Sequence, residues 1–148
     1  MRAFIALGSN LGDRWGNLAA GLEALRLLGW VTPSPLVMET PDESGSGPDY
    51  LNSVAMLETE LDNPCPLLEE LLRIELRLGR DRTQGRNAPR TLDLDLIEAG
   101  DFAGLWRWPT PADLVVLGDE LRLELPHPRA LDRTFVQEPL AALRRLLT

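Results

Sequence analysis

Residues 91–97 read Thr-Leu-Asp-Leu-Asp-Leu-Ile, and this stretch decides how the fold is interpreted. Apolar and polar residues alternate strictly along it, which is the pattern of a β-strand with one buried face. The leucines would bury that face, and Asp93 and Asp95 would lie side by side on the other. A strand of this kind needs a covering layer of other elements.

Apolar periodicity in the rest of the chain supplies the other elements. Short apolar runs and alternation predict strands, and leucines at helical spacing predict helices. Asn10 or Asp13 could cap the first helix, and Asn63-Pro64 opens the second, since proline is tolerated in a first turn. The predicted strands are 3–7, 31–39 (an edge strand that starts late) and 50–61. The predicted helices are 18–28, 63–79 and 139–147. A predicted hairpin joins 114–117 to 121–125, and the segment 101–113 is expected to be irregular.

The order of these elements is β-α-β-β-α-β, followed by a hairpin and a helix. It predicts an α+β fold with helices on one face of a mainly antiparallel sheet. The 148 residues fit one domain, 1–148, that can bury a core without disulfides, and Cys65 is the only cysteine.

The composition excludes several classes of protein. The net charge is −8, and all 15 basic residues are arginine, which argues against general nucleic-acid binding. The absence of lysine also excludes a P-loop. No apolar stretch reaches the ~18–20 residues of a membrane span, and the first residues lack a secretory signal. We therefore expect a cytoplasmic protein with no membrane and no nucleic-acid partner.

Asp93 and Asp95 are the first candidates for chemistry. Two carboxylates on one strand face repel one another unless a cation lies between them. Mg²⁺ suits such a pair, because it prefers oxygen ligands and keeps waters and substrate phosphates in its shell. Taken alone, the pair could also be an exposed strand face with scattered acids.

An arginine-rich segment precedes this strand and strengthens the metal hypothesis. Between residues 73 and 90, six arginines accompany only two acids, Glu75 and Asp81. Guanidinium groups bind phosphate oxygens in pairs, so the segment predicts phosphate binding beside a metal site. That combination is typical of phosphoryl or nucleotidyl transfer. For Arg73 and Arg77, on the predicted helix, pairing with surface acids remains an alternative.

Seven motifs in order resemble the 6-hydroxymethyl-7,8-dihydropterin pyrophosphokinase family. The resemblance covers residues 3–142, with an interruption at 98–114 that looks inserted. The motifs are Ala-Leu-Gly-Ser-Asn-Leu-Gly-Asp (6–13), Glu-Thr-Pro (39–41), Pro-Asp-Tyr-Leu-Asn (48–52), Arg-Ile-Glu-Leu-Arg-Leu-Gly-Arg (73–80), Ala-Pro-Arg-Thr-Leu-Asp-Leu-Asp-Leu (88–96), Leu-Pro-His-Pro (125–128) and Arg-Thr-Phe-Val (133–136).

This resemblance implies a ferredoxin-like fold and an activity in folate biosynthesis. The family transfers pyrophosphate from ATP to the hydroxymethyl group of a reduced pterin and releases AMP. By resemblance, Asp93 and Asp95 hold two Mg²⁺ ions, and the hydroxyl attacks the β-phosphorus in line.

The resemblance also assigns residues to the two substrates. The catalytic arginines by resemblance are Arg80, Arg82 and Arg90. The ATP side comprises Glu75, Arg82, Arg90, Arg122, His127 and Arg133. The pterin side comprises Thr40, Tyr50, Asn52, Asp93 and Phe135, where Tyr50 and Phe135 sandwich the ring and Asn52 reads its pyrimidine edge.

Departures from the family pattern concern the loops. Asn87 aligns with a tryptophan that covers the pterin in the best-known members. The loop after Pro41 is shorter, and it has Asp42 and Glu43 where some members carry apolar residues. Two other classes remain open: a metal-dependent nucleotidyl- or glycosyltransferase, and a non-catalytic module that binds nucleotides or phosphoproteins. We expect ATP and the pterin as small-molecule partners of a monomer.

Overall fold

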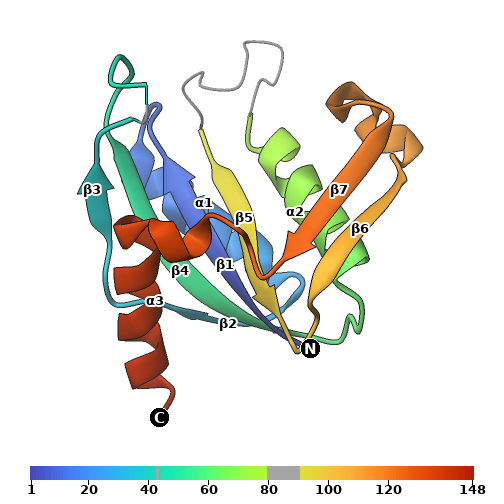
Figure 1. Ribbon diagram of the computed structural model, residues 1–148. Helices are drawn as coiled ribbons and strands as arrows, with labels where there is room; N and C mark the ends of the chain where they lie inside the picture. Colours follow the sequence, from blue (N-terminus) through green and yellow to red (C-terminus); the bar gives the residue numbers. More distant parts are fainter. Residues whose placement is uncertain (43, 80–90) are drawn as a thin grey trace.

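The computed structural model describes residues 1–42, 44–79 and 91–148. A five-stranded antiparallel sheet forms its centre (Figure 1), in the order β2-β4-β1-β5, and β3 also pairs with β4. The strands are β1 (Arg2–Ser9), β2 (Gly29–Pro33), β3 (Met38–Thr40), β4 (Tyr50–Thr59) and β5 (Asp93–Ala99).

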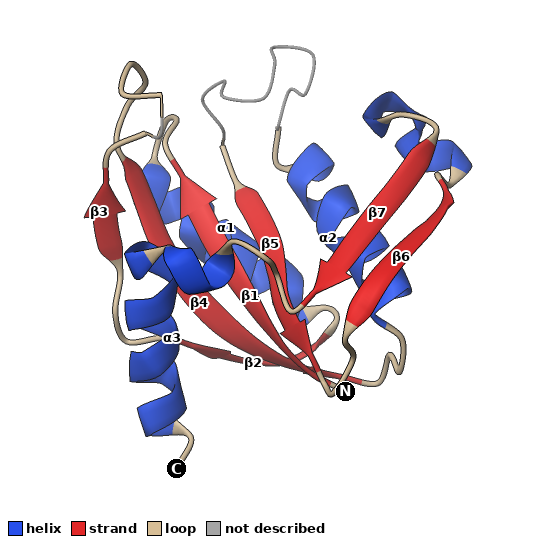
Figure 2. Ribbon diagram, viewed as in Figure 1, coloured by secondary structure: helices blue, strands red, loops and turns tan. Residues whose placement is uncertain are grey.

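Helices cover both faces of this sheet. The helices α1 (Arg14–Arg26) and α2 (Pro64–Arg77) lie behind it in Figures 1 and 2, and α3 (Thr134–Leu146) lies in front. The α+β class with a mainly antiparallel, ferredoxin-like sheet that was predicted from the sequence is confirmed, but the order up to β5 is β-α-β-β-β-α-β, with one more strand than predicted. The prediction that the helices lie on one face is wrong, because α3 covers the other.

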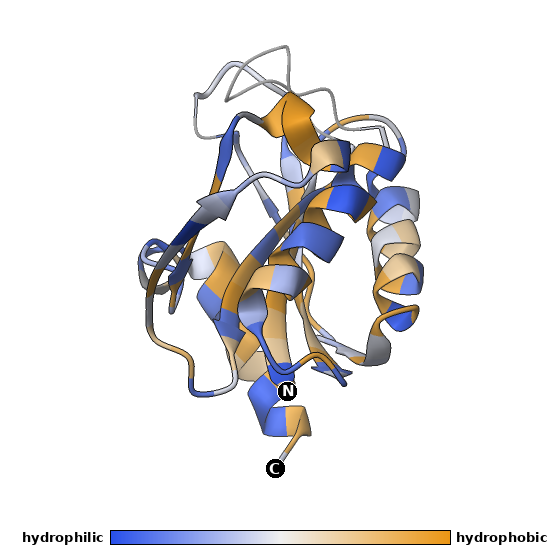
Figure 3. Ribbon diagram, turned by 90° about the vertical axis from the view of Figure 1, so that its right-hand side faces the viewer, coloured by the Kyte–Doolittle hydropathy of each residue, from blue (hydrophilic) through white to orange (hydrophobic). Residues whose placement is uncertain are grey.

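The central strands explain why a second helical layer forms. Ile5 and Leu57 pack into a core with α1 and α2, whereas Phe4, Val54 and Met56 form a second core with α3. Strands that are apolar on both faces need cover on both. Orange and blue residues alternate along the helices in Figure 3, as expected where one side of each helix is buried.

Side-chain caps begin the first two helices. The Asp13 carboxylate accepts a hydrogen bond from the N–H of Gly16 at 3.0 Å, and Asn63 accepts one from the N–H of Cys65 at 2.8 Å. Asp13, rather than Asn10, is therefore the cap of α1. Asn10 is buried instead, and its side chain donates to the carbonyl oxygen of Pro48 at 3.1 Å.

The predicted edge strand 31–39 is two strands. Pro33 and Pro35 lack N–H donors and interrupt the pairing with β4. Between the two strands, the N–H of Ser34 donates to the carbonyl oxygen of Val54 at 2.8 Å. The Ser34 hydroxyl donates to the carbonyl oxygen of Pro139 at 2.7 Å, which ties this connection to α3.

The second half of the chain departs most from the sequence predictions. Residues 114–117 are not a strand but part of the 3₁₀ helix η2 (Ala112–Leu117), and the strand β7 (Glu120–Leu125) pairs with β6 (Gly104–Pro109). The segment 101–113, predicted to be irregular, thus supplies one strand of the hairpin. The α3 helix starts at Thr134, five residues before the predicted position 139.

Two polar contacts hold the β6–β7 hairpin against α2. The Trp108 indole N–H donates to the Glu69 carboxylate at 2.9 Å, and the Arg73 guanidinium pairs with Asp113 at 2.7 Å. That ion pair lowers the pKa of Asp113. The short 3₁₀ helix η3 (Ala130–Asp132) then leads into α3. Among the described residues, no helix combines the length and apolar character that a membrane crossing requires.

Two leucines test the assignment of the core. Leu57 is 0% exposed and Leu27 is 81% exposed. Leu57→Ala should lower the free energy of unfolding by about 2–5 kcal/mol, since it leaves a cavity between the sheet and the helices. Leu27→Ala should change it by less than about 0.5 kcal/mol. Urea denaturation measures both, and equal effects would contradict the assignment.

Candidate active site

The register of three strands builds the floor of a cavity on the α3 side of the sheet. Gly8 on β1 lies opposite Asn52 on β4 and Asp93 on β5, and Ala6 lies between Val54 and Asp95. These rows share one sheet face, because paired residues and residues two apart point the same way. The small residues at positions 6 and 8 leave a depression between the larger ones.

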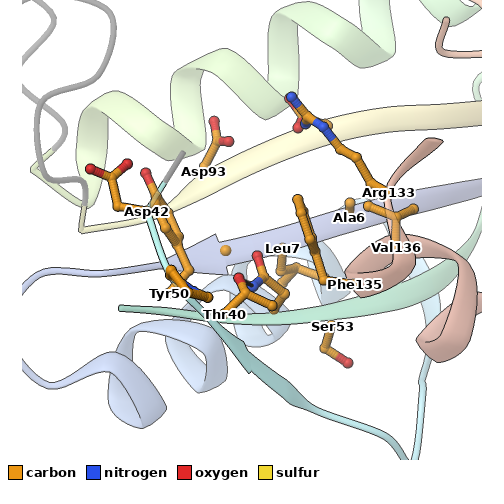
Figure 4. A pocket seen from close by; sticks show the side chains of 14 residues that line it. Ala6, Leu7, Thr40, Asp42, Tyr50, Ser53, Asp93, Arg133, Phe135 and Val136 are labelled. Atoms are coloured by element: carbon orange, nitrogen blue, oxygen red, sulfur yellow. Dashed lines mark hydrogen bonds between the residues drawn. The ribbon is translucent and has the colours of Figure 1, made fainter. Parts of the chain in front are cut away.

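Fourteen residues line this cavity, and seven of them were predicted from the sequence. Figure 4 shows Tyr50 and Phe135 on opposite sides of the gap, with Asp93 above it. The cavity therefore has two parts. One is an aromatic slot between Tyr50 and Phe135, and the other is an acidic rim formed by Asp93 and Asp95. The seven predicted residues are Thr40, Tyr50, Asn52, Asp93, Asp95, Arg133 and Phe135.

Gly8 is a site residue that the sequence analysis missed. A Cβ atom at this position would lie 3.2 Å from Oδ1 of Asn52 and 3.4 Å from Cδ1 of Tyr50. Any side chain would therefore enter the slot. The predicted strand 3–7 ends before Gly8, whereas β1 continues to Ser9, and a glycine within a strand can mark the close approach of a ligand.

Asn52 and Thr40 form one polar wall of the slot. Asn52 is 7% exposed, and its Nδ2 donates to the Thr40 hydroxyl at 2.8 Å. This bond fixes the amide plane. Because Nδ2 points to Thr40, Oδ1 lies on the side of Gly8 and the cavity.

Asp42 lines the same cavity and organises the loop beside it. Its carboxylate is buried and accepts hydrogen bonds from the N–H of Gly47, at 3.0 Å, and from the Ser44 hydroxyl. The sequence marked Asp42 as an unusual acid but gave it no role. Its burial depends on the loop folding back, which no local pattern reveals.

Asp93 and Asp95 are half-buried at the rim of the cavity, and the leucines between and beside them are buried on the other face. The predicted strand with an acidic and an apolar face is confirmed, although it runs from Asp93 to Ala99 rather than from 91 to 97. Their carboxylates offer only oxygen ligands, which suits a hard cation such as Mg²⁺. In the part of the chain that the structure describes, no cluster of three or more metal-binding side chains forms. Mg²⁺ typically uses one or two carboxylates with waters and phosphates, so the pair fits it.

Other predicted residues lie outside the cavity lining. Glu75 is buried in α2, where its carboxylate accepts a hydrogen bond from the N–H of Leu94 at 2.7 Å. Arg122 is exposed on β7 and pairs with Glu124 at 3.3 Å. The predicted Arg80, Arg82 and Arg90, and also Asn87, fall outside the described residues.

His127 is anchored to β5 by an irregularity in the strand. The pairing of β5 with β1 shifts between Phe4 and Ile5, which leaves Ile97 as an extra residue. Such a bulge turns backbone groups out of the ladder. The carbonyl oxygen of Ile97 accepts a hydrogen bond from the N–H of His127 at 2.9 Å.

The surroundings of His127 favour its neutral form. Burial lowers its pKa below the ordinary value of 6.5, and the charges of Arg133 and Arg129 lower it further against the opposing effect of Asp93 and Glu124. Nδ1 accepts a hydrogen bond from the N–H of Arg129 at 3.2 Å. The geometry therefore assigns the proton to Nε2, which is free to donate to an anion.

Arg133 brings positive charge to the cavity. Its guanidinium lies 5.6 Å from the centre of the Phe135 ring, within the range of a cation–π contact. A flat aromatic slot, paired carboxylates and an arginine thus meet in one cavity. This combination has the chemistry expected of an enzyme site for a planar ring next to phosphates and a hard cation.

Comparison with known proteins identifies the family within that class. Residues 4–145 match the model of the 7,8-dihydro-6-hydroxymethylpterin-pyrophosphokinase (HPPK) family. The chain belongs to this family, as the sequence motifs predicted, and it is an enzyme of the pyrophosphokinase class.

Three relatives illustrate the match. The chain is 40% identical over 141 residues to the 2-amino-4-hydroxy-6-hydroxymethyldihydropteridine pyrophosphokinase of Haemophilus influenzae, an alignment that covers 93% of this chain and 78% of the relative. The enzyme of the same name from Pseudomonas aeruginosa is 38% identical, with 96% and 80% covered. The mitochondrial folate synthesis bifunctional protein of Pisum sativum is 37% identical, with 94% of this chain and 24% of that protein covered.

The lowered pKa of His127 predicts a pH dependence of stability. As pH falls from 7.5 to 5.5, the unfolded chain protonates its histidine first, so the free energy of unfolding falls. In His127→Gln that decrease should be smaller, because the glutamine does not titrate. Urea denaturation at the two pH values measures the difference, and an equal decrease in both proteins would contradict the assigned environment.

Proposed function

We propose that this chain transfers pyrophosphate from ATP to the hydroxymethyl group of 6-hydroxymethyl-7,8-dihydropterin in the cavity described above. Asp93 and Asp95 are the proposed ligands of two Mg²⁺ ions. The observation that carries the proposal is the row formed by Asn52, Gly8 and Asp93. It sets the wall of the aromatic slot next to the acids, so a ring in the slot has its substituent near the metal site.

The pterin half of the proposal rests on shape and hydrogen bonding. Tyr50 and Phe135 provide apolar faces for a flat conjugated ring, and offset stacking favours such contacts. Gly8 leaves room for the ring edge. Thr40 holds the Asn52 amide so that its carbonyl oxygen faces the cavity, where it can accept from a ring N–H. A nucleotidyl- or glycosyltransferase without a pterin has no need of this slot.

The phosphate half of the proposal rests on charge. Mg²⁺ held by Asp93 and Asp95 would neutralise triphosphate oxygens and stabilise charge that develops on them. Arg133 supplies a fixed positive charge on the same cavity. His127, neutral and with its proton on Nε2, is a suitable donor to a phosphate oxygen. Arg80, Arg82, Arg90 and Arg122 remain predicted contacts of the nucleotide.

The chemistry of the step follows from this arrangement. The hydroxymethyl oxygen of the pterin bonds to the β-phosphorus, and the bond from that phosphorus to the oxygen bridging to the α-phosphate breaks. AMP leaves with the bridging oxygen, and the hydroxyl proton passes to solvent. Holding both substrates in one cavity removes most of the entropic barrier to their encounter.

Release of AMP tests the proposal directly. The protein should release AMP from ATP only when both Mg²⁺ and the reduced hydroxymethylpterin are added. Asp93→Asn and Asp95→Asn should each lower kcat by at least about 100-fold, because each removes several kcal/mol of charge stabilisation at the metal site. Circular dichroism should show that both variants keep the fold.

Two results would contradict the proposal. Release of AMP without the pterin would indicate a different transfer reaction. Near-normal turnover in both aspartate variants would remove the metal assignment.

Gly8→Ala tests the slot separately from the metal site. The added methyl group would meet Asn52 and Tyr50, so binding of the pterin should weaken by about 1–3 kcal/mol. Calorimetry with the pterin and, as a control, with a non-hydrolysable ATP analogue separates the two substrates. Unchanged pterin affinity would place the ring elsewhere.

A further inference from the structure

A buried acid lies behind the strand that carries the two aspartates. Glu75 is 1% exposed, and its Oε2 accepts a hydrogen bond from the backbone N–H of Leu94 at 2.7 Å. Leu94 stands between Asp93 and Asp95 in the sequence. Glu75 thus contacts the backbone of the metal-binding segment from the opposite face of the sheet.

The position of β5 explains why this contact matters. Among the residues that the structure describes, β5 pairs with β1 on one side only and is therefore an edge strand. In an antiparallel strand, alternate residues direct their N–H groups away from the neighbour. Leu94 is such a residue, and without Glu75 its N–H would have no partner within the sheet. An edge strand held on one side only shifts more readily than a central one.

The chemical nature of the partner also points to a special role. Glu75 is buried on α2, as are its neighbours Leu71 and Ile74, which are both 0% exposed. Burying a carboxylate is costly unless hydrogen bonds compensate. A charge-assisted bond to a backbone N–H is shorter and stronger than a neutral one, as the 2.7 Å distance indicates.

We propose that Glu75 is a positioning residue of the metal site. By fixing the peptide group that joins Asp93 to Leu94, it fixes the stretch of backbone from which Asp93 and, two residues on, Asp95 project. The affinity for the divalent cation then depends on Glu75, although Glu75 does not line the cavity. This role differs from the direct nucleotide contact that the family resemblance implies, and it rests on the proposed function of the two aspartates.

Two substitutions separate the hydrogen bond from the charge. Glu75→Gln keeps an acceptor oxygen for the Leu94 N–H, whereas Glu75→Leu removes it and keeps a similar volume. Glu70→Leu is the control, because Glu70 lies on the same helix and pairs with Arg73 at the surface rather than with β5.

Amide hydrogen exchange of the metal-free protein is the first measurement. The Leu94 amide should exchange slowly in the wild type, in Glu75→Gln and in Glu70→Leu, and at least about tenfold faster in Glu75→Leu. Equal protection in the wild type and Glu75→Leu would overturn the inference. This readout needs neither metal nor substrate.

The second measurement is the affinity for Mn²⁺, a spectroscopic substitute for Mg²⁺, in the presence of a non-hydrolysable ATP analogue. It should fall about tenfold in Glu75→Leu, as for other partners that orient metal ligands, and stay within about threefold in Glu75→Gln. If Glu75→Leu does not fold, Glu75→Gln decides alone: retained Leu94 protection and Mn²⁺ affinity support the inference, and loss of either overturns it.

The aspartate variants keep this test separate from the proposed function. Mn²⁺ affinity that is unchanged in Asp93→Asn would overturn the proposed function and this inference with it. Mn²⁺ affinity that falls in Asp93→Asn but not in Glu75→Leu would overturn this inference alone.

Discussion

The pairing register of β1 with its two neighbours is the constraint on which the site depends. It sets Gly8 between Asn52 and Asp93, and Ala6 beside Asp95. Side chains alternate between faces with a period of two, so a slip of one residue would turn all of them toward α1 and α2. The buried apolar residues on both faces of β1 and β4 oppose such a slip, because it would expose them. Stability and the geometry of the cavity therefore have the same origin.

The second helical layer covers only part of the sheet, and this is what leaves a cavity. The helix α3 packs on Phe4, Val54 and Met56, and its first turn carries Phe135 to the edge of the uncovered region. The larger core behind the sheet holds the floor rigid. The face covered by α1 and α2 is thus packed with buried side chains, while the face covered by α3 holds the cavity with Phe135 and the charged side chains.

Local patterns in the sequence predicted the elements that depend on local chemistry. The strict alternation of 91–97, the helix start at Asn63-Pro64 and the leucine spacing of the first two helices could be predicted, since each follows from neighbouring residues. The pairing of β6 with β7 was not, because strand partners are chosen by contacts distant in sequence. The predicted hairpin paired 121–125 with the wrong segment, since the valines at 115 and 116 resemble a strand locally.

The candidate site shows the same limit. Motif resemblance found the residues with distinctive side chains, including Tyr50, Asn52 and Phe135. It did not find Gly8, which leaves the slot open because it has no side chain. Nor did it find the contact of Glu75 with Leu94. A glutamate in a helical pattern is ordinarily exposed, and its burial arises only when the edge of β5 meets α2.

The hydrogen bond between Ser34 and Pro139 has a consequence for how the protein is made. It joins positions 105 residues apart and fastens α3 across the connection between β2 and β3. During synthesis on the ribosome, the sheet and its first two helices emerge before residues 134–146 do. The slot therefore lacks the Phe135 wall until α3 has been made and has packed on the sheet, so the sheet and its first two helices do not complete the cavity by themselves.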